Sequence, residues 1–306
     1  MIRRFLLAAA VITGGPVFAA DTAPVRNFAP GFVTVYDSTA QLPMPARVAA
    51  MRGLLMAEYP EFYGRRKPEQ LDKKVQQAIE GFPKIRTAYL DKSEKFGAAL
   101  DQHMRTFNRV FPKYENATPI TLVHSLGEMD GGPRELNGSI HLVFGADVMA
   151  ETNPDGNSAP LFHHELFHLL HRQKFACDTD GIWEPLWGEG LAVYVSEVMN
   201  PGANENELLL NFPRGMAANT RAVLPAAWAQ LQTVLDSTDE KLAQELFTMS
   251  GKATTLPVRR GYYLGYLVAK EAGKTRDLAT LAALDCKQVR ALVGETVGKL
   301  AKESNP

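Results

Sequence analysis

Residues 163–171 constrain this chain more than any other segment, because they read His-His-Glu-Leu-Phe-His-Leu-Leu-His. Within this run, His164, Glu165 and His168 form the pattern H-E-x-x-H. Side chains four residues apart lie on the same face of a helix, one turn from each other. Two imidazoles placed in this way can bind one zinc ion at about 2.0–2.1 Å each. The segment therefore predicts a helix that carries two metal ligands.

Glu165 is predicted to act as the general base, because it lies beside both ligands and can take a proton from a zinc-bound water. Zinc lowers the pKa of such a water to about 7, so hydroxide forms at neutral pH. The apolar residues of the same run form a stripe on roughly the opposite side, at Phe162, Leu166, Leu169 and Leu170. We therefore expect one face of this helix to pack in the core and the other to line a cleft.

The third ligand is predicted to be Glu189, in the run Trp-Gly-Glu-Gly-Leu-Ala at 187–192. A second helix packed against the first can deliver this carboxylate to the same metal, and two His with one Glu leave a fourth position open for water. His171 is the alternative, seven residues after His164 on the same helix. If it is not a ligand, we expect His171, like His163, to form hydrogen bonds beside the cleft or to face solvent.

The H-E-x-x-H motif followed at this distance by a Trp-x-Glu-Gly-x-Ala element resembles the gluzincin metallopeptidases, the thermolysin and aminopeptidase-N group. The resemblance covers residues 160–200 well and 120–270 loosely. It implies a mixed sheet whose edge strand lies beside the metal helix, followed by a helical subdomain. Residues 139–144 are the predicted edge strand, where an extended peptide can pair. The metzincin pattern is not met, because it requires Gly and His where this chain has His171 and Lys174.

The same resemblance suggests an oxyanion donor. Aminopeptidase-N-like enzymes carry a catalytic Tyr in a Y-x-x-G element, and Tyr262 with Gly265 matches it. A neutral Tyr hydroxyl is a suitable donor, since its pKa is near 10. Tyr263 is the alternative donor, and aromatic packing on an amphipathic helix is the competing interpretation of both residues. Residues 127–131, Gly-Glu-Met-Asp-Gly, also resemble the G-x-M-E-N element that holds a substrate amine, although a glycine-rich turn explains them more simply.

The chain departs from the thermolysin pattern at one position. Thermolysin-like enzymes place an acidic residue four positions after the Glu ligand, where it orients a ligand histidine. Val193 occupies that position here. Support for the ligands is therefore expected from Glu184, from Glu197 or from a backbone carbonyl.

The wider pattern predicts an α+β fold with a mainly helical C-terminal part. Strands are expected at 32–36, 120–124 and 139–144, with a turn-rich connection over 127–138. Residues 45–112 show helical spacing interrupted by prolines, including Pro83. Later helices are expected at 160–175, 184–199, 225–236, 239–249, 259–272 and 288–302. We divide the chain into a lead-in and helical region over 21–115 and a gluzincin-like catalytic region over 116–306.

The first twenty residues have the layout of a secretory signal peptide. Arg3 and Arg4 precede the apolar run FLLAAAVI, which is too short to remain as a bilayer-spanning helix. Cleavage is expected after Ala19 or Ala20, and an uncleaved N-terminal anchor is the alternative. Export predicts a periplasmic or secreted protein, in which Cys177 and Cys286 can pair. The sequence equally allows two buried free thiols.

The composition suits a sizeable core, with 45% hydrophobic residues in 306. The formal net charge of -1 and the lack of a basic patch argue against a nucleic-acid partner. No stable membrane insertion is expected after signal cleavage, and the oligomeric state stays open.

The sequence thus predicts an exported peptidase that uses Zn²⁺ and acts on a peptide or protein substrate. The alternatives are an inactive zinc-binding module of the cell envelope, an amidase or endopeptidase for peptidoglycan peptides, and a chance motif in a helical scaffold.

Overall fold

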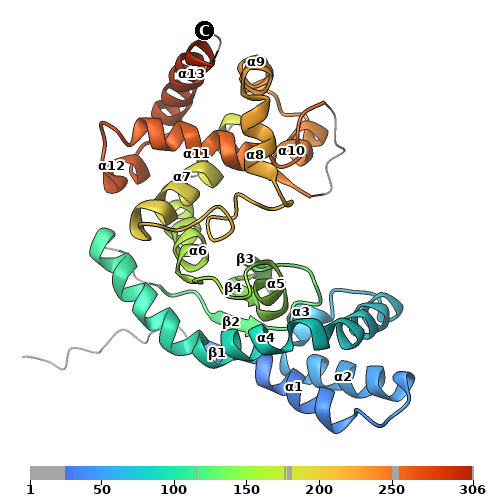
Figure 1. Ribbon diagram of the computed structural model, residues 1–306. Helices are drawn as coiled ribbons and strands as arrows, with labels where there is room; N and C mark the ends of the chain where they lie inside the picture. Colours follow the sequence, from blue (N-terminus) through green and yellow to red (C-terminus); the bar gives the residue numbers. More distant parts are fainter. Residues whose placement is uncertain are drawn as a thin grey trace, which may run out of the picture.

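The computed structural model describes residues 25–112, 114, 116–175, 177, 181–249 and 255–304. The predicted signal peptide at residues 1–20, with its cleavage site, lies outside these described residues. The described residues form a four-stranded mixed sheet surrounded by helices, with a helical C-terminal part (Figure 1). The predicted α+β class is therefore confirmed.

The sheet has the strand order β1-β2-β4-β3. Its strands are β1 (Val25–Asn27), β2 (Ile120–Val123), β3 (Gly131–Leu136) and β4 (Ser139–Gly145). The pairs β1–β2 and β2–β4 are parallel, whereas β3 and β4 are antiparallel. All four residues of β2 are buried, as expected for a central strand covered on both faces. Because β1 pairs with β2, the N-terminal region contributes a strand to the same sheet.

The prediction that residues 139–144 form the edge strand was wrong. This run forms most of β4, which lies between β2 and β3, and the edge strand that contacts the helix of residues 159–172 is β3. Asn137 and Gly138 both have positive φ, 50° and 76°, and reverse the chain in a two-residue hairpin turn. The Gly-Gly-Pro run within 127–138 was taken for a turn, but Pro133 is tolerated in β3 because an edge strand can lack one N–H.

The N-terminal region forms the helices α1 (Ala29–Ser38), α2 (Met44–Glu58), α3 (Pro60–Tyr63) and α4 (Pro68–Val110). The strand predicted at 32–36 was wrong, because this segment is the middle of α1. Pro30 lies in the first turn, where a proline favours the helix, and Asn27 accepts a hydrogen bond from the Ala29 N–H at 3.0 Å. Phe32 is buried and stacks on the His124 ring, with the ring centroids 3.9 Å apart. This burial outweighs the β preference of the β-branched residues in the same segment.

Helix α4 is 43 residues long and contains Pro83, so the predicted helix break at that proline was also wrong. A proline inside a helix costs about 3 kcal/mol. Buried apolar side chains lie on both sides of Pro83, and each contributes about 1.5–3 kcal/mol when fully buried. They include Leu71, Val75, Ile79, Phe82, Tyr89 and Phe96. This continuous apolar face keeps α4 intact beneath the sheet (Figure 1).

The remaining helices begin after β4 and lead from the sheet to the C-terminal part, in the upper half of Figure 1. They are α5 (Ala146–Thr152), α6 (Ala159–Arg172), α7 (Trp183–Met199), α8 (Met216–Ala222), α9 (Leu224–Val234), α10 (Glu240–Phe247), α11 (Gly261–Ala272), α12 (Leu278–Ala282) and α13 (Cys286–Glu303). The six helices predicted after residue 160 are confirmed to within a few residues at each end, while α5, α8 and α12 were missed.

Cys177 and Cys286 form a disulfide, with their Cα atoms 5.8 Å apart. The bond links the segment after α6 to the first residue of α13, so it joins the region of α6 to the C-terminal helices. In the described part of the chain, no helix is long and apolar enough to span a bilayer.

Candidate metal centre

Helices α6 and α7 bring together the three predicted metal ligands. His164 Nε2 and His168 Nε2 lie 3.0 Å apart, and each lies 3.3 Å from Glu189 Oε2. Among the described residues, these three side chains form a group whose ligand atoms all lie within 4.8 Å of one another. The two histidines share a face of α6 because they are one turn apart, and α7 supplies the carboxylate from the facing helix.

The distances within this group suit a tetrahedral metal ion. Ligand atoms at about 2.0–2.1 Å from zinc lie roughly 3.3 Å from one another in a tetrahedron. Glu189 Oε2 is buried and has no hydrogen-bond partner among the described residues, so it is an acceptor that lacks a donor. A cation at the centre of the three atoms would satisfy it.

Electrostatic attraction between the two histidines and Glu189 changes the pKa values of these side chains. Burial alone would raise the pKa of the Glu189 carboxyl, but the two histidines outweigh burial and hold this pKa well below its usual range. Burial alone would lower the pKa of His168, and the Glu189 carboxylate reverses that effect and raises it. Glu189 is therefore ionised at neutral pH, which is the form that binds a metal.

Glu165 is buried between α6 and the edge strand β3. A Cβ atom on Gly131 would lie 3.0 Å from the Phe144 ring and 3.2 Å from Glu165 Cγ, so a glycine lets β3 approach α6 this closely. Burial raises the pKa of the Glu165 carboxyl, although the charges of His164 and His168 lower it. A raised pKa brings a carboxylate nearer to the value that suits a general base at neutral pH.

Strand β3 presents one backbone carbonyl, that of Gly131, at its open edge next to Glu165. The Gly145 N–H donates to the Asp130 carbonyl at 2.9 Å, which marks residues 130 and 145 as a hydrogen-bonded pair. In an antiparallel ladder the next residue, Gly131, then directs its N–H and C=O away from β4. Asp130 Oδ1 accepts from this N–H at 2.9 Å, while the Gly131 carbonyl faces the open edge.

Tyr262, at the start of α11, lines the same cleft as the ligands and Glu165. Its ring is nearly parallel to that of His164, with centroids 6.4 Å apart. Burial raises the pKa of the Tyr262 hydroxyl, and the nearby Glu189 charge raises it further, so the hydroxyl remains a donor. The alternative donor, Tyr263, instead accepts a hydrogen bond from Arg221 Nε at 3.1 Å and packs against Tyr266.

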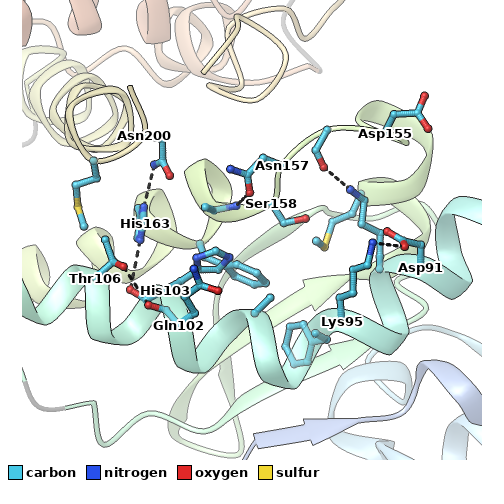
Figure 2. Close-up of a pocket in the computed structure, with 18 residues that line it drawn as sticks. Asp91, Lys95, Gln102, His103, Thr106, Asp155, Asn157, Ser158, His163 and Asn200 are labelled. Atoms are coloured by element: carbon cyan, nitrogen blue, oxygen red, sulfur yellow. Dashed lines mark hydrogen bonds and ion pairs between the residues drawn. The ribbon is translucent and has the colours of Figure 1, made fainter. Parts of the chain in front are cut away.

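His163 takes no part in the metal group. It is buried and faces a second cavity of about 610 Å³ beside α4, shown in Figure 2. Its Nδ1 accepts from Asn200 Nδ2 at 2.9 Å and its Nε2 donates to the His103 carbonyl at 3.3 Å, so both ring nitrogens have partners (Figure 2). This neutral, satisfied histidine has a structural role.

His171 is also outside the metal group. Its ring is stacked between Phe167 and Phe175, at centroid distances of 5.1 Å and 4.4 Å. Burial lowers the pKa of His171 to about 4, helped by the charge of His168. Of the two third ligands considered from the sequence, the structure brings only Glu189 to the histidine pair.

The expected support for the ligand histidines is not found at Glu197. The Glu197 carboxylate accepts from the Tyr266 hydroxyl and from Lys270 Nζ, both at 2.7 Å. Val193 is fully buried among apolar side chains. His164 Nδ1 is buried and has no hydrogen-bond partner among the described residues. The departure from the thermolysin pattern at Val193 is therefore not compensated by Glu197.

The cleft has a volume of about 260 Å³ and contains residues that the sequence analysis did not single out. They are Arg134, Arg172, Leu209 and Arg259. Arg172 was detectable, since it lies one turn after His168 on the same face of α6. Arg134 and Arg259 gave no local signal, because each lies in an irregular or proline-containing segment and reaches the cleft only through the tertiary fold.

The resemblance at residues 127–131 concerns this same region. Asp130 lines the cleft, whereas Glu128 forms ion pairs with Arg65 and Arg66. Comparisons with protein-family models, with curated proteins and with solved structures each found no match. The geometry of the cleft is therefore the basis for any assignment.

Proposed function

We propose that this chain is a zinc-dependent peptidase of the gluzincin type, with the metal held by His164, His168 and Glu189. The observation that carries this proposal is that the three ligand atoms lie 3.0–3.3 Å apart in the same cleft as Glu165 and Tyr262. A mere ligand set needs neither a buried carboxylate nor a protonated phenol beside it. Export through the N-terminal signal would place the enzyme in the periplasm or outside the cell.

The chain's own residues would divide the work of hydrolysis. Bound zinc would supply Lewis acidity and make its water acidic enough to ionise near neutral pH. Glu165 would take the proton of that water and pass it to the leaving amine. The Tyr262 hydroxyl would donate a hydrogen bond to the oxyanion. An extended peptide would donate a backbone N–H to the Gly131 carbonyl at the open edge of β3.

The test begins with the zinc content of the purified mature protein, measured beside His164→Ala and Glu189→Ala. One zinc per chain in the wild type and loss of zinc in both variants are expected. Hydrolysis of a broad peptide library by the zinc-loaded wild type is the second requirement. A protein that binds zinc but cleaves no peptide would be the inactive zinc-binding module, and a protein that cleaves only cell-wall digests would act on peptidoglycan peptides.

A further inference from the structure

The metal cleft carries excess positive charge once its cation is counted. Three arginines line it, each from a different element: Arg134 of β3, Arg172 of α6 and Arg259 just before α11. Three carboxylates also line it: Asp130, Glu165 and Glu189. These formal charges cancel, so a bound zinc ion leaves the cleft with two net positive charges. An enclosed site of one sign concentrates ligands of the opposite sign.

Arg134 is only weakly neutralised by its nearest carboxylate, Glu128. Their closest charged atoms, Arg134 Nε and Glu128 Oε1, are 3.8 Å apart. Glu128 has closer contacts with two other arginines, with Arg65 at 3.2 Å and with Arg66. The Glu128 carboxylate is therefore shared by three guanidinium groups. Arg134 keeps 31% of its side chain exposed in the cleft and can accept a second anionic partner.

The Arg134 guanidinium lies close to the predicted reacting centre. A Cβ atom on Gly132 would lie 3.4 Å from Arg134 Nη1 and 3.8 Å from Glu165 Oε2, so both groups flank the same point of the edge strand. Nη1 also donates to the Pro133 carbonyl at 3.0 Å, which fixes the direction of the side chain along β3. If a peptide bound along this edge, the side chain or terminus beside its scissile bond would lie next to Arg134.

Arg259 lines the same cleft and is held in place by several contacts. Its Nη1 donates to the carbonyls of Leu209 and Phe212, at 2.9 Å and 2.8 Å, and its guanidinium stacks over the Tyr262 ring at 3.7 Å. Because both carbonyl bonds start from Nη1, the N–H groups on Nε and Nη2 are not used by them. The φ of Arg259 is 61°, in the left-handed region that a non-glycine residue rarely adopts.

We propose that Arg134 and Arg259 form a carboxylate subsite at the metal centre, and that the substrates are peptides with a carboxylate beside the scissile bond. This carboxylate is either an acidic side chain or a free C-terminus, which are the same group for a guanidinium. The proposal rests on the proposed peptidase function for its biological meaning. The recognition itself is a binding property and can be measured without turnover.

The test uses the zinc-loaded Glu165→Gln variant and three pentapeptides that differ in one group. The first is acetylated, amidated and neutral with Gln at its centre; the second has Glu in place of that Gln; the third keeps Gln but ends in a free carboxylate. Isothermal titration calorimetry gives their affinities. We expect one charged peptide to bind about tenfold more tightly than the neutral one, because a hydrogen bond between a guanidinium and a carboxylate is stronger than one between neutral groups. The charged peptide that has the higher affinity shows whether the carboxylate comes from an acidic side chain or from a free C-terminus.

Two substitutions, each added to Glu165→Gln, separate the subsite from general charge. Arg134→Gln is expected to remove the advantage of the charged peptide, whereas Arg65→Gln, which loses the same charge from the Glu128 cluster outside the cleft, is expected to keep it. Equal affinity for all three peptides, or no binding of any, would overturn the subsite. An advantage that survives Arg134→Gln would also overturn it, because Arg134 would then take no part in binding the carboxylate.

The wild-type protein with the same peptides tests the proposed function separately. If the charged peptide binds in the expected way but neither it nor a broad library is cleaved, the peptidase function fails while the carboxylate subsite stands.

Discussion

Gly190 of α7 and Gly265 of α11 lie so close together that a Cβ atom on Gly190 would be 2.1 Å from the carbonyl carbon of Gly265. A Cβ atom on Gly265 would likewise lie 2.2 Å from the Leu186 carbonyl oxygen. This crossing places Glu189, the neighbour of Gly190, and Tyr262, one turn before Gly265, at the same cleft. The two glycines therefore set the distance between the candidate metal ligand and the proposed oxyanion donor.

Gly190→Ala is expected to separate α7 from α11 and to destabilise the fold by at least about 1–3 kcal/mol, the usual cost of overpacking. Gly188→Ala is the matched control, because it lies two residues earlier on α7 and nothing lies within 4 Å of its Cβ position. That change should stabilise the helix by about 0.5–1 kcal/mol. Urea denaturation of both variants measures the difference. Equal stabilities would show that the crossing adapts without cost.

Glu165→Gln is expected to keep one zinc per chain and to lose peptidase activity by a factor of about 10²–10⁴, the usual contribution of a general base. The amide keeps the shape of the buried side chain but cannot take a proton from water. Zinc analysis and steady-state kinetics on the same preparation provide the two measurements. Unchanged activity with full zinc occupancy would exclude the proposed mechanism.

Tyr262→Phe is expected to lower kcat by about 10²–10³, the usual cost of losing one oxyanion donor. The phenyl ring retains the packing against Arg259 and His164, so KM and folding should change little. Tyr263→Phe serves as the control, since that hydroxyl bonds to Arg221 outside the cleft. Similar losses in both variants would point to a structural role for the aromatic pair.

Removing the Cys177–Cys286 disulfide is expected to destabilise the protein by about 2–5 kcal/mol. The bond closes a loop with a sequence separation of 109 residues, so breaking it restores much freedom to the unfolded chain. The double variant Cys177→Ser/Cys286→Ser avoids a lone reactive thiol. Its thermal unfolding, compared with that of oxidised wild type, provides the measurement, and an unchanged midpoint would contradict the prediction.

Acid is expected to weaken the fold partly through His103. Burial lowers the pKa of His103 to about 4 from its ordinary 6.5, with a smaller contribution from His163. Between pH 6.5 and pH 4, His103 therefore binds a proton in the unfolded chain but not in the folded chain. The free energy of unfolding falls as the pH drops through this range. Below that range the residue contributes no further loss.

Denaturation of chelator-treated protein across this pH range measures the effect without zinc release. His103→Phe should reduce the slope of stability against pH without removing it, because His163 and His171 also have pKa values lowered to about 4, and burial lowers the pKa values of His124 and His141. An unchanged slope in His103→Phe would show that its ring is already protonated in the fold.

The sequence by itself determined the features that depend on local spacing. His164 and His168 share a helix face because the helical repeat places residues four apart together. The positions of most C-terminal helices followed from the same periodicity, and Glu189 was found by its short flanking pattern. The α+β class was also predicted, since strand-like runs precede a long helical region.

Only the tertiary structure decided which segments meet. Residues 139–144 were correctly predicted to form a strand, but the position of a strand in the sheet depends on its neighbours. Strand β3 lies at the edge of the sheet, and residues 139–144 lie in the strand next to it. Arg134 and Arg259 reach the cleft from separate segments, and Cys177 meets Cys286 across 109 residues. Such contacts arise from packing between elements that are far apart in the chain. A short stretch of sequence carries no information about that packing. That is why the three candidate ligands could be named from the sequence, while the charged residues around them could not.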